Sequence, residues 1–150
     1  MNEGRILLAT FCDDIRQEVG YKFSLMGCYA GGELIVDTMP IVLPKIFASI
    51  EVLSAIVNPL KQLTIRAFLN DTLLAENVFP ADKLPLESDI NKIKDSSDSR
   101  YILHLQLAFI PLIIEKDSIL KIEADTEEGF LKGSRLMIRL RQDYDAPITQ

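Results

Sequence analysis

Residues 100–141 read RYILHLQLAFIPLIIEKDSILKIEADTEEGFLKGSRLMIRLR. Three segments of this stretch follow a period of two: Tyr101–Phe109, Ile119–Ala124 and Arg135–Arg141. Side chains on a β-strand point alternately to the two faces of the sheet, so each segment predicts a strand with one buried and one solvated face. The stretch therefore predicts antiparallel β-sheet structure, and it indicates no particular chemistry.

Similar patterns recur toward the N-terminus, and a tight hairpin is predicted around Asn70-Asp71 because both residues tolerate left-handed backbone conformations. The other predicted strands and the two arms of this hairpin are Arg5–Cys12, Tyr21–Tyr29, Glu33–Val36, Lys45–Leu53, Leu63–Leu69 and Thr72–Val78. No repeat or linker divides the 150 residues, which suit one domain. We therefore predict an all-β fold: a single domain, residues 1–150, folded as an antiparallel, immunoglobulin-like β-sandwich of seven to nine strands.

Four segments depart from the strand pattern. Met39–Pro44 contains two prolines, which lack the amide hydrogen that a central strand donates, so it is predicted as an edge segment or a crossing between sheets. Asp13–Gly20 is predicted as a polar connection with a single capped helical turn. Residues 79–100 are predicted as a long polar loop, and residues 143–150 as a frayed tail.

The composition excludes several classes of function. Net charge is −6, whereas binding to a phosphate backbone needs a surplus of Lys and Arg on one face, so no nucleic-acid partner is predicted. The longest uncharged apolar run, Leu107–Ile114, is far shorter than the ~20 residues of a membrane helix, and no secretory signal is predicted. We expect a cytoplasmic protein with no membrane partner. Apolar residues make up 48%, which indicates a well-filled core or an exposed patch that meets a partner.

The two cysteines are predicted to be free thiols in a reducing compartment. If Arg5–Phe11 pairs with Tyr21–Tyr29 as a hairpin, Cys12 lies near its turn and Cys28 near its open end. A disulfide between them is then geometrically awkward.

The acidic segment Asp13–Glu18 is the strongest candidate for a metal site. Its candidate ligands are Asp13, Asp14 and Glu18. Loop carboxylates hold hard cations such as calcium, and Asp71 joins them if it lies at the same end of the sandwich. The favoured alternative is a helix cap with ion pairs to Arg16 and Lys22, because surface carboxylates are usually solvated. We therefore predict no cofactor.

The single histidine and a row of arginines are the other candidates. His104 lies in the middle of a predicted strand, and no Gly-x-Ser-x-Gly elbow is present, so a structural role is favoured and no catalytic residue is predicted. Arg135, Arg139 and Arg141 share one face of a predicted strand and form a basic stripe that suits an acidic partner or a phosphate. The favoured alternative is an outward row whose aliphatic stems cover apolar neighbours.

The N-terminal third carries a family resemblance. The segments CDDIR (12–16) and GYKFSLMGCY (20–29), followed by Pro40 and Leu43-Pro44, resemble a family of small uncharacterised bacterial proteins grouped as a domain of unknown function. The shared pattern is a cysteine-aspartate pair, a Gly-x-Lys-x-Ser-Leu-x-Gly strand and a proline-bounded segment. The resemblance implies an immunoglobulin-like sandwich and a bacterial or phage source. It implies no activity, so no catalytic residue is transferred.

Three functional hypotheses follow. The first is a non-catalytic binding or accessory module that engages another protein by loops or by an edge strand along Ile41–Ala48. The alternative is a structural subunit that binds copies of itself in a bacterial or phage assembly, which is an analogy from the fold. The second alternative is a calcium-dependent binder that uses the Asp13–Glu18 loop. No enzymatic activity is predicted.

Overall fold

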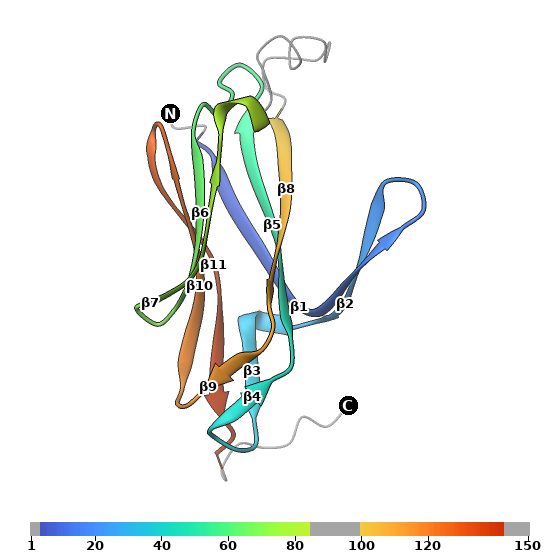
Figure 1. Ribbon diagram of the computed structural model, residues 1–150, viewed down its shortest axis with the longest axis vertical. Helices are drawn as coiled ribbons and strands as arrows, with labels where there is room; N and C mark the ends of the chain where they lie inside the picture. Colours follow the sequence, from blue (N-terminus) through green and yellow to red (C-terminus); the bar gives the residue numbers. More distant parts are fainter. Residues whose placement is uncertain (1–3, 85–99, 143–150) are drawn as a thin grey trace.

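The computed structural model describes residues 4–84 and 100–142, which form eleven β-strands and two short 3₁₀ turns (Figure 1). The strands are β1 (Ile6–Glu18), β2 (Lys22–Cys28), β3 (Glu33–Val36), β4 (Ile41–Leu43), β5 (Ile46–Ala55), β6 (Leu63–Leu69), β7 (Thr72–Phe79), β8 (Arg100–Phe109), β9 (Leu112–Ile114), β10 (Ser118–Thr126) and β11 (Gly129–Leu140). The two turns are η1 (Ala30–Gly32) and η2 (Ala81–Lys83).

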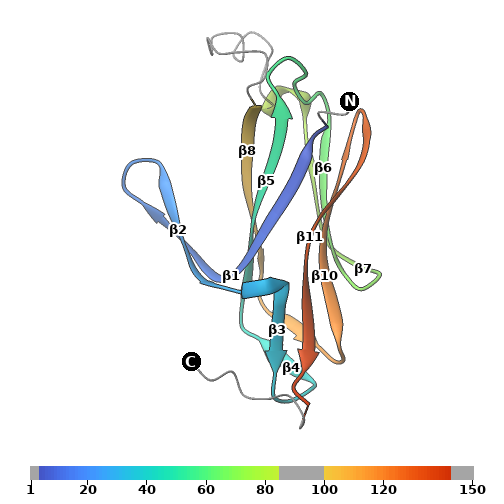
Figure 2. The ribbon, with the colours of Figure 1, turned by 180° about the vertical axis from the view of Figure 1, so that it is seen from behind.

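Nine of these strands form two sheets that pack face to face (Figures 1 and 2). The first sheet has the order β2-β1-β5-β8 and the second the order β3-β11-β10-β6-β7, while β4 and β9 form a separate two-stranded sheet. The predicted all-β sandwich is confirmed. Two details differ: the described residues form eleven strands instead of seven to nine, and β3 runs parallel to β11, whereas the other described pairs are antiparallel.

The hydrophobic core lies between the two large sheets. Four alternating side chains of β5 are fully buried: Ile46, Ala48, Ile50 and Val52. They belong to one core cluster with buried side chains of the second sheet, which include Ile65, Leu120, Ile122, Leu136 and Ile138. Because burial of one aliphatic side chain contributes about 1.5–3 kcal/mol, this interleaved layer is the main source of stability.

The chain crosses between the sheets at two proline-containing segments. β8 pairs with β5 in the first sheet, whereas β10 and β11 pair with each other in the second, so the three strands of residues 100–141 do not form one sheet. Between them the chain passes Pro111 and forms β9, which pairs with β4. Likewise β4 lies between β3 of the second sheet and β5 of the first. Of the two predicted alternatives for Met39–Pro44, an edge segment or a crossing between sheets, the crossing is confirmed.

β1 is longer than predicted and forms part of a projecting arm. Its first half pairs with β5 and its second half with β2, and this hairpin, Cys12–Cys28, extends away from the sandwich (Figures 1 and 2). We call it the arm. Gly20 and Tyr21 make its turn, with φ values of 92° and 59°.

The predicted polar connection at Asp13–Gly20 with a helical turn is therefore wrong, because residues up to Glu18 are extended. Main-chain hydrogen bonds to β2 satisfy this segment without a buried face, so it carries no period-two signal. The predicted hairpin register is also wrong, since the arm places Cys12 directly opposite Cys28.

The first half of β1 also lies against β11 and closes one side of the sandwich. The Ala9 amide donates a hydrogen bond of 3.0 Å to Ser134 Oγ. Between Lys121 and Glu123 the β10–β11 register shifts, which gives β11 one extra residue at this point. The bulge therefore brings Gly133 and Ser134 to the place where the two sheets meet.

Two predicted segments lie mostly or wholly outside the described residues. Of the predicted loop 79–100, only residues 79–84 and Arg100 are described, and the predicted tail 143–150 is not described. Across residues 4–84 and 100–142, no helix is long and apolar enough to cross a membrane.

Candidate docking surface

The two-stranded sheet β4–β9 joins two apolar segments that are far apart in the sequence. Val42 lies directly opposite Ile113. The inward side chains of β9, Leu112 and Ile114, are buried in the core, whereas Val42 and Ile113 are 58% and 54% exposed. The pairing of β4 with β9 and the burial of the inward side chains thus fix the position of the two exposed side chains, Val42 and Ile113.

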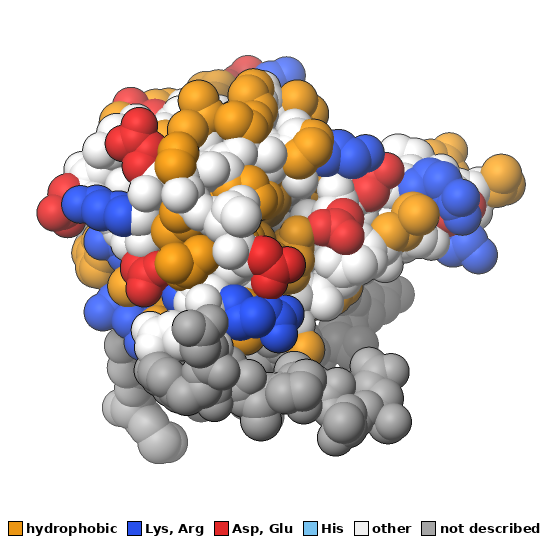
Figure 3. All heavy atoms as spheres, turned by 90° about the horizontal axis from the view of Figure 1, so that it is seen from below, with side chains coloured by type: hydrophobic (Ala, Val, Ile, Leu, Met, Phe, Trp, Pro, Cys, Tyr) orange, Lys and Arg blue, Asp and Glu red, His pale blue; other side chains and the backbone are white. Residues whose placement is uncertain are grey.

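Ile110 and three prolines extend this exposed surface. We define the apolar cap as Pro40, Val42, Pro44, Ile110, Pro111 and Ile113, all of which are exposed. Neither Met39–Pro44 nor Leu107–Ile114 contains a charged residue. Figure 3 looks onto the end of the molecule that carries β4 and β9, and it shows hydrophobic side chains gathered there with acidic and basic side chains around them. Contiguous exposed apolar surface of this kind is typical of protein contact sites.

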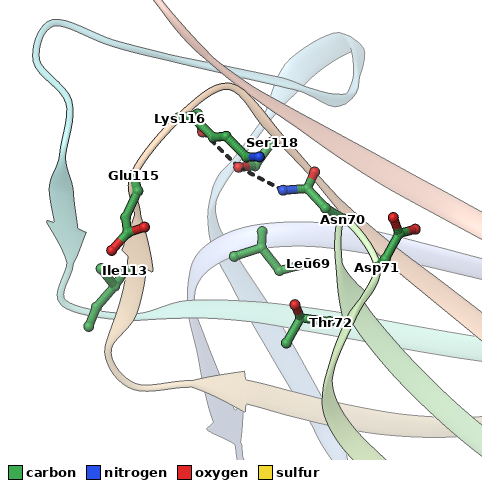
Figure 4. A pocket seen from close by; sticks show the side chains of 8 residues that line it. All are labelled: Leu69, Asn70, Asp71, Thr72, Ile113, Glu115, Lys116 and Ser118. Carbon is green, nitrogen blue, oxygen red and sulfur yellow. Dashed lines mark hydrogen bonds between the residues drawn. The ribbon is translucent and has the colours of Figure 1, made fainter.

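A polar cleft of about 500 Å³ adjoins the apolar cap at Ile113 (Figure 4). Asn70, with a left-handed φ of 54°, holds its two walls together. The Asn70 side-chain amide donates to Ser118 Oγ at 3.2 Å, and its Oδ1 accepts from the Ile119 amide at 3.0 Å. The predicted hairpin at Asn70-Asp71 is confirmed, and its turn is tied to the first two residues of β10. The cleft offers charged and hydrogen-bonding groups beside the cap.

The three predicted metal ligands lie on the arm, and the structure does not bring them together. Asp14 forms an ion pair of 3.0 Å with Lys45, and this hydrogen bond lowers the pKa of Asp14. Glu18 accepts hydrogen bonds from Arg16 at 2.8 Å and from Ser24 at 3.0 Å. Asp13 is next to Asp14 on one strand, so the two carboxylates point to opposite faces.

Asp13 accepts a hydrogen bond from the Tyr29 hydroxyl, and burial raises the pKa of that phenol. In the described part of the chain no group of three or more His, Cys, Asp or Glu side chains is placed to hold a metal ion. The alternative of ion pairs is confirmed for Arg16, while Lys45 takes the place predicted for Lys22. We propose no calcium site on the arm.

The predicted basic stripe is largely paired with the neighbouring strand. Arg139 forms an ion pair of 3.1 Å with Glu33, and Arg141, just beyond the end of β11, forms one of 2.9 Å with Asp37. Glu33 lies in β3 and Asp37 directly follows it, and β3 pairs in parallel with β11. These two arginines therefore help to hold β3 on the sheet edge. Arg135 remains exposed on the same strand.

His104 connects the arm with strands β5 and β8 of the same sheet. Its ring stacks on Phe23 of β2, with centroids 4.2 Å apart and 14° between the planes. His104 Nε2 and Ser49 Oγ are hydrogen-bonded at 2.9 Å, and Ser49 is buried although it lies on the outer face of β5. The structural role predicted for His104 fits these contacts, which the sequence alone did not indicate.

Stability is expected to depend on pH through His104. Burial lowers the pKa of His104, and the charge of Glu51 opposes this shift. The unfolded chain therefore binds a proton more readily than the folded chain, so stability present above the ordinary pKa of 6.5 is lost as the pH falls through the lowered value. Urea unfolding should show wild type losing stability relative to the His104→Gln variant as the pH falls below 6.5. In a Glu51→Gln variant the pKa of His104 should fall further, so the loss of stability should extend to lower pH. Equal pH profiles of wild type and His104→Gln would show that His104 does not cause the pH dependence.

The predicted edge strand Ile41–Ala48 is not one edge. Ile46–Ala48 belongs to β5, which pairs with β1 on one side and β8 on the other, so its main-chain groups are already used. Of the predicted segment only β4, Ile41–Leu43, keeps a side without a partner among the described strands. Side-chain contact through the apolar cap therefore replaces edge pairing as the basis of the binding hypothesis.

Comparison with known proteins finds no family model that matches the chain and no curated protein with significant sequence similarity. The resemblance to the uncharacterised bacterial family and the immunoglobulin-like class of the sandwich stay predictions.

Proposed function

We propose that this chain is a non-catalytic binding module that engages another protein through the apolar cap. The observation that carries the proposal is the pairing of two uncharged, proline-containing segments, which presents Val42 and Ile113 side by side in solvent. Covering such side chains with a partner is favourable by about 25 cal/mol per Å² of apolar area. The conformational entropy lost on binding is also small, because the inward side chains of β9, Leu112 and Ile114, are already fixed in the core.

The composition of the cap defines the partner. With no charged residue in either segment, the cap suits an uncharged, apolar face of another protein that places an aliphatic or aromatic anchor over Val42 and Ile113. The adjoining cleft supplies Asp71, Glu115 and Lys116, which suit polar groups at the rim of such a contact.

Two further observations support a module without catalysis. His104 is engaged by Phe23 and Ser49, and the arm carboxylates each have their own partner. We place the module in the cytoplasm of a bacterium, an assignment supported by the family resemblance and by two unpaired thiols.

The proposal is tested with the double variant Val42→Asp/Ile113→Asp and the matched control Val78→Asp. Val78 is 66% exposed on β7 in the second sheet and lies outside the cap. In affinity capture from lysate of the source cells, wild type and Val78→Asp should retain the same stoichiometric protein. The double variant should lose at least about tenfold of that capture, because two buried charges remove the central contacts. Urea unfolding confirms that all three proteins fold.

Equal capture by the double variant would exclude the cap as the contact site.

The alternative of a self-associating structural subunit is favoured by one observation: the arm ends in Val19, which is 93% exposed, and in the exposed Tyr21. Sedimentation of the purified wild type separates the two. Concentration-dependent oligomers that survive Val42→Asp/Ile113→Asp would favour the subunit, and a monomer would favour the binding module.

A further inference from the structure

The two cysteines are directly paired across the two strands at the root of the arm, where the Cys12 thiol donates a hydrogen bond of 3.3 Å to the Asp14 carbonyl. Cys12 on β1 is the direct partner of Cys28 on β2. In the adjacent pair the Tyr29 amide donates a hydrogen bond of 3.0 Å to the Phe11 carbonyl. Hydrogen-bonded and non-hydrogen-bonded pairs alternate along an antiparallel ladder, so Cys12 and Cys28 occupy a non-hydrogen-bonded position. Such positions place the Cα atoms about 4.5 Å apart with the side chains closest, which lies within the range that a disulfide spans.

The two thiols differ in exposure. Cys28 is exposed and Cys12 is fully buried. Burial raises the pKa of Cys12, and the neighbouring Cys28 adds to that shift. A reagent in solution therefore reaches Cys28 first, while Cys12 is positioned behind it.

We propose that Cys12 and Cys28 form a reversible thiol–disulfide site that reacts with small disulfides such as oxidised glutathione. The Cys28 thiolate attacks one sulfur of the glutathione disulfide, which forms a mixed disulfide and releases one glutathione thiolate. Cys12 then loses its proton to solvent and attacks the Cys28 sulfur, which releases the second glutathione thiolate. Two protein thiols are oxidised by two electrons, and one glutathione disulfide is reduced to two thiols.

The disulfide between Cys12 and Cys28 would constrain the arm. Cys12 also pairs with Phe47 of β5, so the cross-link forms where β1 leaves the sandwich. It would join the two strands of the arm at their base and enclose the turn at Gly20 and Tyr21. Oxidation of a cytoplasmic protein at such a pair is transient and follows the thiol–disulfide balance of the cell.

The test is equilibration of the reduced full-length protein with mixtures of oxidised and reduced glutathione, followed by intact mass measurement. Wild type should lose two hydrogen masses, Cys12→Ala should gain one glutathione, and Cys28→Ser should stay unmodified. A wild type that keeps both thiols, or that accumulates one stable glutathione adduct, would overturn the proposal. This test is independent of partner capture by the cap.

Connectivity is read by limited chymotrypsin cleavage after the exposed Tyr21, which lies between the two cysteines. The oxidised wild type should run as one band without reductant and as two with it. Two bands under both conditions would show that the oxidised product does not join Cys12 to Cys28.

Discussion

Replacing Glu127 with Gln is expected to lower the free energy of unfolding by about 3–5 kcal/mol at pH 7, the cost of breaking a buried ion pair. Arg5 is almost fully buried, and its guanidinium donates to Glu127 Oε1 and, at 3.3 Å, to Ser54 Oγ. The Glu127 carboxylate also accepts from the amides of Lys61 at 3.1 Å and Gln62 at 3.0 Å. Glutamine turns an NH₂ group toward these donors, and the buried Arg5 charge keeps only the longer ion pair of 3.4 Å with the exposed Glu128.

The pH dependence of this contribution has a defined sign. Burial by itself raises the pKa of Glu127, but hydrogen bonds from Arg5 and from backbone amides outweigh it and hold the pKa at about 2, below the ordinary 4.5. The unfolded chain therefore takes up the proton first on acidification. The stability from Glu127 is present above about pH 4.5 and is lost as the pH falls toward 2.

Urea unfolding of wild type and Glu127→Gln from pH 7 to pH 2 measures both effects. The difference in the free energy of unfolding between the two proteins should disappear as the pH falls from about 4.5 toward 2. Glu76→Gln is the control, because Glu76 pairs with Arg66 at 2.8 Å on a more exposed surface and should cost no more than about 1 kcal/mol. A loss below about 1 kcal/mol in Glu127→Gln would show that the Arg5 pair does not stabilise the fold.

The elements that the sequence predicts well are those decided locally. The alternation in β5 fixes which side chains face the core, and the Asn70-Asp71 turn fixes the pairing of Leu69 with Thr72 that begins the β6–β7 hairpin. Further along this hairpin the register shifts between Ala67 and Phe68. The short strand Glu33–Val36 is also confirmed, with the predicted bounds. Its parallel pairing with β11 is not visible in its sequence, because a period of two defines faces but not partners.

The candidate sites depend on such partners, so the sequence predicted them poorly. Arg139 and Arg141 form a basic stripe in the sequence of β11 and the residue after it, but in the structure Glu33 and Asp37 lie beside them and neutralise their charges. The apolar cap was visible as two separate signals, a proline-containing segment and an uncharged run, but only β4–β9 pairing joins them. The opposed cysteines were missed because a polar strand with no buried face gives no periodic signal.

Replacing Gly133 with Ala is expected to cost about 2–3 kcal/mol, as overpacking of a filled core does. A Cβ atom at Gly133 would lie 2.7 Å from the Ile122 carbonyl oxygen and 2.8 Å from Leu7 Cδ2. The first of these atoms belongs to the backbone of β10, so it moves only if the sheet moves. Gly133 lies where β1 meets β11, and Ser134 beside it accepts the Ala9 amide, so a shift there also strains that hydrogen bond.

Urea unfolding of Gly133→Ala, Leu7→Ala and the double variant separates the two clashes. Lys132→Ala, at an exposed neighbouring position, should change stability by no more than about 0.5 kcal/mol and serves as the control. If the Leu7 contact carries part of the cost, the double variant loses less than the sum of the single variants by at least about 0.5 kcal/mol. A neutral Gly133→Ala would mean that neither the Ile122 carbonyl of β10 nor Leu7 of β1 lies this close to Gly133.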